Sequence, residues 1–268
     1  MIKANQQSKS ILIGCLTVTA LLAGTLYLSL PAQFADAADT ENRHRGKITD
    51  VEGVARKLPQ LANDWITAVV GSDVVSGDRV RTLSDSQAEL TLKELNVVRL
   101  GPLTTIDIVK LYEETKEGRD QTAIKVERGD IWALVSDVED KADFKVSSPV
   151  AGAAITGTKF RISVAPDSST ILKVYKGEVR ITNSPENAVL IPAELPDMRP
   201  KQIAKPKQVA GPAQISFKEW YFIVTGMQEI RIDGRGNLMA AGAFSPSDKD
   251  EENAWVEWNK RKDEELGK

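Results

Sequence analysis

The chain has 268 residues, a net charge of −3, 27% charged residues and 41% hydrophobic residues, which is the composition of an ordinary soluble globular protein. Charges of both signs are mixed along it and no basic stretch dominates, which argues against a nucleic-acid-binding protein. One cysteine and one histidine in the whole chain leave little material for thiol catalysis, histidine catalysis or a zinc site.

Residues 1–37 predict a signal peptide or a membrane anchor. A polar start with two lysines precedes an uncharged apolar run at 11–30. Ala35 and Ala37 have the spacing that a signal peptidase reads, but a run of about 20 residues is also long enough to span a bilayer as a transmembrane helix. Under both alternatives the bulk of the chain is exported, and the protein is periplasmic or extracytoplasmic, either secreted or anchored in the inner membrane.

The only cysteine and the only histidine lie outside the region expected to fold. Cys15 is in the leader, in a sequence similar to a lipoprotein acylation site, but its apolar stretch follows it, so we interpret it as an ordinary leader residue. His44 is in a polar tether at 38–47 and has no converging ligand residues. We therefore expect no catalytic residue, no metal site and no cofactor.

Residues 48–184 consist of short runs in which apolar and polar residues alternate, separated by Gly, Pro, Asp and Ser. This pattern is typical of half-buried β-strands and predicts an all-β domain, because little helical periodicity lies between the runs. The expected strands are 88–92, 97–100, 104–110, 122–126, 131–135, 144–146, 160–164, 170–175 and 179–181.

Gly77, Gly129 and Gly177 are each followed by an acidic residue and then by a strand pattern. We expect each glycine to supply the positive φ of a tight turn before a new strand. Their spacings, 52 and 48 residues, are near those of repeat proteins and suit a twisted, solenoid-like or rolled antiparallel sheet.

The last third of the chain changes character. A Pro/Lys-rich stretch at 185–214 predicts a linker or a strap along the surface. A small β segment is expected at 215–244, with strands at 228–232 and 238–241, and a short helix at 245–268. Trp255 and Trp258 share one face of that helix, where they could dock on the β domain, lie on a membrane or contact a partner.

About residues 48–183 contain, in this order, the motifs Gly77-Asp78, Leu100-Gly101-Pro102, Gly129 with Trp132, Ser148-Pro149, and Gly157-Thr158 with Phe160. Together and in this order, these motifs resemble the FecR-like domain. Relatives often have Arg before the Gly-Thr pair, where this chain has Thr156. The resemblance implies an exported β domain in which the motif residues have structural roles. They are Gly77, Asp78, Gly101, Pro102, Gly129, Trp132, Pro149, Gly157, Thr158, Phe160 and Gly177.

FecR itself is a membrane-spanning regulator with a cytoplasmic anti-sigma segment. Only about ten residues precede the apolar run here, too few for a folded module, so we do not expect the anti-sigma function. We expect an exported, non-enzymatic FecR-like domain that acts as a binding or scaffold module in the cell envelope, for an envelope protein or a surface polymer.

The first expected contact surface is an exposed sheet edge, by strand addition, and the second is Trp255 with Trp258. Two alternatives remain open: a sensor subunit of a cell-surface signalling system, and a cell-wall carbohydrate-binding protein. An enzyme is disfavoured because the paired carboxylates lie in polar loops, where a raised pKa is not expected.

Overall fold

The computed structural model describes residues 45–92, 96–114, 120–136, 142–185 and 220–267. The leader, most of the tether and the Pro/Lys-rich stretch predicted from the sequence lie outside these ranges. The chain divides into two compact units, Met1–Arg43 and His44–Lys268, and the described residues belong to the second. Within them, no helix has the length and apolar character needed to cross a membrane.

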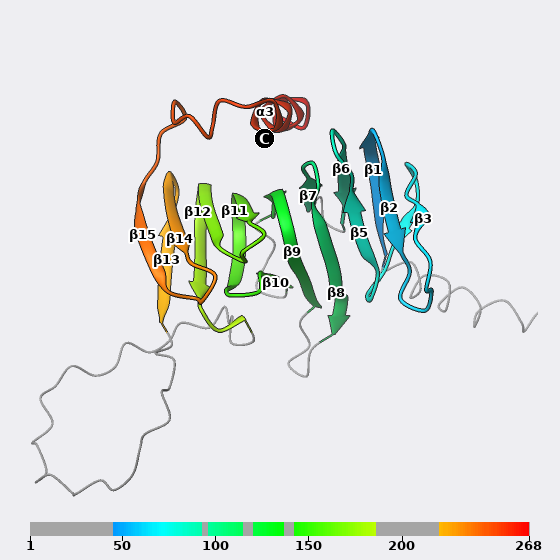
Figure 1. The fold of residues 1–268 in the computed structure, drawn as a ribbon, viewed down its shortest axis with the longest axis horizontal. Coiled ribbons are helices and arrows are strands. Elements are labelled where there is room, and N and C mark those ends of the chain that lie inside the picture. Colours follow the sequence, from blue (N-terminus) through cyan, green and yellow to red (C-terminus); the bar gives the residue numbers. More distant parts are fainter. Residues whose placement is uncertain (1–44, 93–95, 115–119, 137–141, 186–219, 268) are drawn as a thin grey trace, which may run out of the picture. The chain divides into compact units, whose positions relative to one another are not determined.

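The second unit is one open β-sheet followed by a helix (Figure 1). The strands are β1 (Gly46–Glu52), β2 (Ala55–Leu58), β3 (Ile66–Thr67), β4 (Asp73–Val74), β5 (Arg79–Thr82), β6 (Gln87–Thr91), β7 (Val97–Leu100), β8 (Thr105–Glu114), β9 (Asp120–Leu134), β10 (Ala142–Ser147), β11 (Gly152–Val164), β12 (Thr170–Thr182), β13 (Tyr221–Thr225), β14 (Gln228–Ile232) and β15 (Leu238–Ala243), and the helix is α3 (Ala254–Glu265).

Three long strands, β9, β11 and β12, change partners halfway along, and this folds the sheet over itself. The first half of β9 pairs with β8 and β10, and its second half pairs with β7 and β11. The first half of β12 pairs with β14 and its second half with β13. One layer, here layer A, therefore contains β1, β6, β7 and β14, and the other, layer B, contains β2, β3, β5, β8, β10 and β13.

Glycines allow these strands to bend. Gly129 lies within β9 at φ +92, and Gly177 lies within β12 at φ +91. A Cβ on Gly177 would come within 2.5 Å of the carbonyl oxygen of Gly157, where the β11–β12 register shifts. The prediction of positive φ at Gly77, Gly129 and Gly177 is confirmed. The prediction that Gly129 and Gly177 separate strands is wrong, because a glycine bulge bends a strand without ending it.

The core lies between the two layers. Burial alternates along most strands, as the sequence pattern predicted, and inward side chains such as Ile48, Leu90, Ile106, Ile124 and Phe160 are fully buried. The all-β class and the rolled, twisted sheet are confirmed. One pairing, β9 with β10, is parallel, whereas the sequence had suggested antiparallel pairing throughout.

The C-terminal part joins the same sheet. β13 and β14 both pair with β12, and β15 extends the sheet beyond β14. The helix begins at Ala254, about nine residues later than the sequence suggested, because Asn253 is the residue whose side chain caps it, accepting a hydrogen bond from the Val256 N–H at 3.0 Å. Residues 245–252 form turns that place acidic side chains on the sheet.

Candidate functional site

The first family-motif pair shapes a turn. Gly77 has φ +86, and its N–H donates to the Ile108 carbonyl at 2.7 Å. The buried Asp78 carboxylate accepts hydrogen bonds from the N–H groups of Gln60 and Val75, at 3.2 and 3.1 Å, and pairs with Lys57 at 3.2 Å. A buried carboxylate with three partners is a structural anchor.

The next motif residues form a second turn and its neighbour strand. Gly101 donates its N–H to the Asp130 carbonyl at 2.9 Å, and Pro102 follows it on the surface. Gly129 lies against Thr104, whose Cα would be 2.5 Å from a Cβ at that position. These residues bring two chain segments into contact closer than a side chain would permit.

The remaining motif residues hold β11. Pro149 is exposed in the turn between β10 and β11. Thr158, beside the Gly157 bulge, exchanges backbone hydrogen bonds with Val135 at 2.9 and 3.0 Å, and Phe160 is fully buried in the core. No motif residue described so far presents a reactive group to a cavity.

Trp132 belongs to a row of side chains that crosses the outer face of layer A. Successive strand pairings align, in order, Glu89, Arg99, Trp132, Arg161, Lys173 and Glu229. Neighbouring strands are about 4.8 Å apart, so these side chains are cross-strand neighbours on one face. The row places three basic groups, Arg99, Arg161 and Lys173, on the outer face of layer A.

The C-terminal segment, residues 244–267, covers this row. Asp263 of α3 accepts a hydrogen bond from Arg99 at 2.6 Å and pairs with Lys159 at 2.9 Å. Its second oxygen accepts the Trp132 indole N–H at 3.3 Å. Arg99 is fully buried, so its charge is balanced inside the protein by Asp263 and by Glu89 at 2.8 Å.

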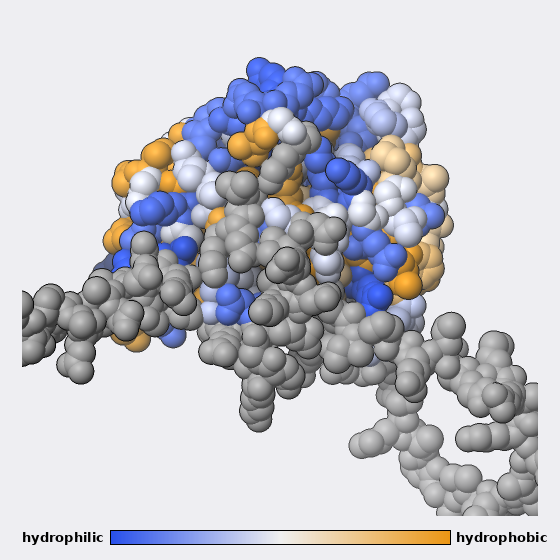
Figure 2. Space-filling model, turned by 180° about the vertical axis from the view of Figure 1, so that it is seen from behind, coloured by the Kyte–Doolittle hydropathy of each residue, from blue (hydrophilic) through white to orange (hydrophobic). Residues whose placement is uncertain are grey.

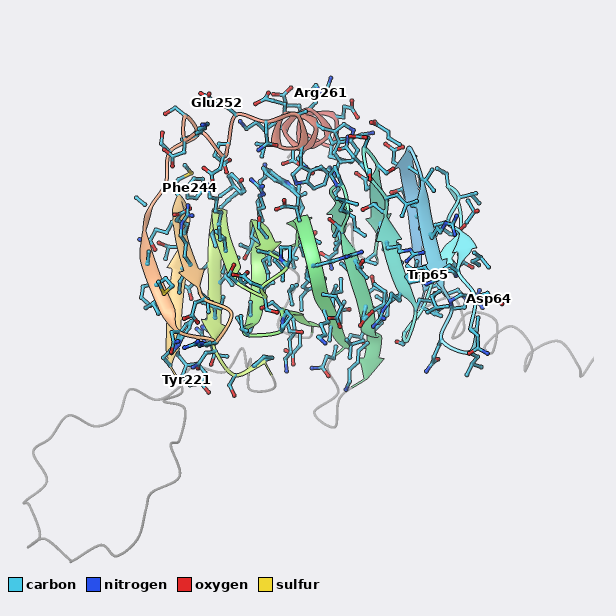
Figure 3. All side chains as sticks on the ribbon, in the orientation of Figure 1. Asp64, Trp65, Tyr221, Phe244, Glu252 and Arg261 are labelled. Carbon is cyan, nitrogen blue, oxygen red and sulfur yellow. The ribbon has the colours of Figure 1, made fainter. Side chains whose placement is uncertain are left out.

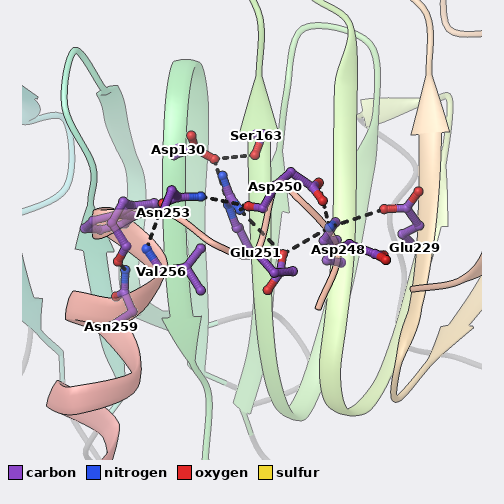
Figure 4. Close-up of polar contacts among 12 residues, drawn as sticks. Asp130, Ser163, Glu229, Asp248, Asp250, Glu251, Asn253, Val256 and Asn259 are labelled. Atoms are coloured by element: carbon purple, nitrogen blue, oxygen red, sulfur yellow. Dashed lines mark hydrogen bonds and ion pairs between the residues drawn. The ribbon is translucent and has the colours of Figure 1, made fainter. Parts of the chain in front are cut away.

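Glu251, in the turns before α3, performs the same role further along the row (Figure 4). Its carboxylate is fully buried and contacts the Lys173 ammonium at 3.0 Å, the Tyr175 hydroxyl at 2.9 Å and Arg161 at 3.6 Å. Burial, followed by the Glu251 charge, raises the pKa of the Tyr175 phenol. Burial alone would lower the pKa of Lys173, but hydrogen bonds to Asp250 and Glu251 outweigh it and raise that pKa.

Trp255 and Trp258 lie on the sheet side of α3 in this arrangement. Their exposed fractions are 7% and 4%, and their rings stack with centroids 5.5 Å apart. The Trp258 indole N–H donates to Glu52 at 2.7 Å, and Trp255 lies over Gly101, whose missing side chain leaves room for the ring. They therefore dock on the chain's own β domain; a partner contact through them stays a prediction that requires α3 to leave the sheet.

The outer edge of the sheet at β15 is exposed. Its sequence, LMAAGA, contains no charge, all six residues are exposed, and it pairs with β14 alone among the described strands. β13, which pairs with β12 alone among the described strands, forms a second exposed edge. Its Tyr221 and Ile223 side chains are more than half exposed. Figure 2, turned from Figure 1, shows apolar surface at the side where these strands lie.

The edge strand is anchored at both ends. After β15, Phe244 is buried and packs edge-to-face on Tyr175, with centroids 5.3 Å apart (Figure 3). Before it, the Trp220 indole N–H donates to the Gly236 carbonyl at 3.1 Å. The backbone of β15 is thus held in place while its outer N–H and C=O groups have no strand partner in the described part of the chain.

Within the described ranges, no three His, Cys, Asp or Glu side chains converge as a metal site would require. The acidic residues that are buried instead neutralise Lys and Arg of the sheet. The sequence singled out the tryptophans of α3 but not their ionic partners Glu251 and Asp263, since the basic residues that bind them lie about 80 to 160 positions away along the chain.

Comparison with known proteins gives a partial assignment. Residues 78–180 match the family model of the FecR protein, which confirms the resemblance seen in the sequence over that range. No curated protein matches the chain. Two crystal structures, both of a candidate anti-sigma factor from Parabacteroides distasonis ATCC 8503, are similar at 13% identity with a TM-score of 0.41; the match covers 62% of this chain and 59% of theirs.

Proposed function

We propose that this protein is an exported, non-enzymatic binding module whose FecR domain presents β15 to an extended segment of another cell-envelope protein. The observation that carries the proposal is the edge itself: six exposed, uncharged residues on an anchored strand. An added strand would satisfy the outer backbone groups of β15, and the exposed Leu238 and Met239 would supply apolar contacts.

Natural proteins commonly protect such an edge with Lys, Pro or a bulge. β15 contains no Lys and no Pro; its one irregularity is a bulge at Met239, which is left unpaired between the Arg231–Ala240 and Ile232–Leu238 pairs. An exposed edge without charge or proline is consistent with a strand that pairs with a partner segment when the protein functions.

The test places a photo-crosslinking amino acid at Met239 of the full-length protein in its native cells. A cross-linked adduct of defined mass is expected, and it should disappear when Ala240→Lys and Ala241→Lys add charge to the edge. The same crosslinker at Lys176, which is exposed on β12, is the matched control. An adduct that still forms in the double-lysine variant, or that forms equally from position 176, would contradict strand addition. An adduct of twice the chain mass would mean that the added strand comes from a second copy of this chain.

A regulatory role is the second candidate, and the FecR family match over residues 78–180 favours it. In that case the strand added at β15 comes from a receptor or a signalling protein. Trp255 and Trp258 are stacked on each other and buried, so they give no aromatic platform in support of carbohydrate binding.

A further inference from the structure

A second row of aligned side chains, three of them arginines, crosses the outer face of layer B. It lies at the opposite end of the sheet from β15 (Figure 1). The strand pairings place Thr67, Arg56, Arg81, Thr105 and Arg128 next to one another in that order. Side chains in such a row stand on the same face of the sheet.

The three arginines of this row are not neutralised by a neighbouring carboxylate. In the described part of the chain, Arg56, Arg81 and Arg128 form no ion pair, whereas the neighbouring Arg79 binds Asp107 at 2.8 Å. The Arg81 guanidinium lies 3.9 Å from the centroid of the Trp65 ring, and its buried Nε has no hydrogen-bond partner. A chain with net charge −3 thus concentrates three uncompensated positive charges in one place.

This face is hollowed in two adjoining places. The first hollow has a volume of about 430 Å³ and is lined by Trp65, Arg79, Arg81, Thr105, Glu127 and Arg128. The second has about 380 Å³, shares Arg79, and has apolar walls that include Leu58, Pro59, Ala62 and Val109. Together they form an extended groove with a basic half and an apolar half; Trp65 marks its basic end in Figure 3.

We propose that this groove binds an extended acidic segment of a partner protein, with Asp or Glu side chains on Arg81 and Arg128 and an apolar side chain between Leu58 and Val109. Guanidinium groups bind carboxylates in a planar, two-pronged geometry, which Arg81 and Arg128 can each offer to an acidic side chain. Arginine and tryptophan together are also the residues that most often dominate binding energy at protein interfaces.

The spacing suits a peptide. β8 separates β5 from β9, so the stems of Arg81 and Arg128 are about 10 Å apart, twice the strand spacing. An extended peptide advances about 3.3 Å per residue, so acidic residues two or three positions apart reach both arginines. The apolar half is what favours a polypeptide over a purely charged polymer, which has nothing to place there.

The site is separate from the edge at β15. It draws on β2, β5, β8 and β9, and on the loop that carries Trp65, and none of these strands pairs with β15. Failure of one proposal therefore leaves the other standing, provided that each is tested with its own variants.

The experiment selects random displayed peptides on the full-length protein and measures their affinity by fluorescence anisotropy. Selected peptides are expected to combine Asp or Glu with apolar residues. Arg81→Gln with Arg128→Gln should weaken their binding at least about tenfold, and higher salt should weaken it too. Arg235→Gln with Lys176→Gln removes two exposed charges elsewhere and should change binding less than about twofold.

Circular dichroism first confirms that each variant is folded, and Val109→Asp tests the apolar half independently, with a loss of affinity expected. Ala240→Lys with Ala241→Lys should leave peptide binding unchanged. Selection of no peptides, selection of peptides without acidic residues, or affinity that survives loss of both arginines would overturn the proposal. Inorganic polyphosphate that binds as tightly as the best peptides would overturn it in favour of a general polyanion site.

Discussion

The contact between α3 and layer A gives a quantitative prediction, through Asp263. Its carboxylate neutralises Arg99, which is fully buried, and also contacts Lys159 and the Trp132 indole. Removing one partner of a buried ion pair costs about 3–5 kcal/mol when the other charge is left uncompensated. Here Glu89 still binds Arg99 at 2.8 Å, and Lys159 is partly exposed, so Asp263→Ala should cost about 2–3 kcal/mol.

In a unit of this size, a loss of that magnitude corresponds to a fall in Tm of roughly 5–10 °C. Thermal unfolding of the full chain, followed by circular dichroism and by tryptophan fluorescence, measures it. Asp263→Asn keeps the size of the side chain and removes its charge, which separates packing from electrostatics. Glu264→Ala is the matched control, because Glu264 is exposed on the same helix and forms no ion pair with another described residue.

If Asp263→Ala lowers Tm no more than Glu264→Ala does, the proposed neutralisation of Arg99 by α3 is refuted. A fluorescence change without a fall in Tm would instead mean that α3 detaches while the sheet keeps its stability. The docked tryptophans, Trp255 and Trp258, report on this directly, since both are buried in the contact with layer A.

Two further predictions concern the same contact. Gly101→Ala places a Cβ about 3.1 Å from the Trp255 ring and should destabilise the protein by about 1–3 kcal/mol in urea unfolding, whereas Gly242→Ala, with nothing within 4 Å, should not. The raised pKa values of Tyr175 and Lys173 mean that the folded state keeps protons which the unfolded state loses above about pH 10, so stability should be complete below that pH and fall as the pH rises further. Tyr175→Phe should make this fall shallower in urea unfolding measured from about pH 9 to 12, and an unchanged slope would contradict the contribution of the phenol.

The strands could be predicted from the sequence because burial in this sheet alternates residue by residue. Phe160, Ile162 and Val164 point inward and their neighbours outward, which is the period-two pattern itself. The continuity of β9 and β12 could not be predicted. A glycine followed by an acidic residue has the same local signature whether it ends a strand or bends one, and only the pairing of both halves distinguishes the two.

The ion pairs between the sheet and the C-terminal segment could be predicted only in part from the sequence. Arg99 lies in the strand VVRL and Lys173 in ILKV, where a charge interrupts apolar residues and must find a partner if both faces are covered. This pattern identifies the buried basic residues but not the carboxylates that pair with them. Asp263 and Glu251 lie in a charged C-terminal stretch where any of several carboxylates would serve equally well from sequence alone.

The arginines of layer B illustrate the same limit. Arg56, Arg81 and Arg128 are separated by 25 and 47 positions, and each is an unremarkable charge within its own strand. They become a row only through three successive registers, β2 with β5, β5 with β8 and β8 with β9, the last of which contains a bulge at Thr105. A shift of one residue in any of them would turn an arginine to the other face.

The two outer faces of the sheet support each other's interpretation. On layer A, a row with Arg99, Arg161 and Lys173 is covered by a segment of this chain that supplies carboxylates from Asp263 and Glu251 together with aromatic rings. On layer B, a row of three arginines beside Trp65 and an apolar hollow has no such cover in the described residues. Because both faces belong to one sheet with the same strand spacing, the acidic and apolar segment that satisfies layer A shows the kind of ligand that would satisfy layer B.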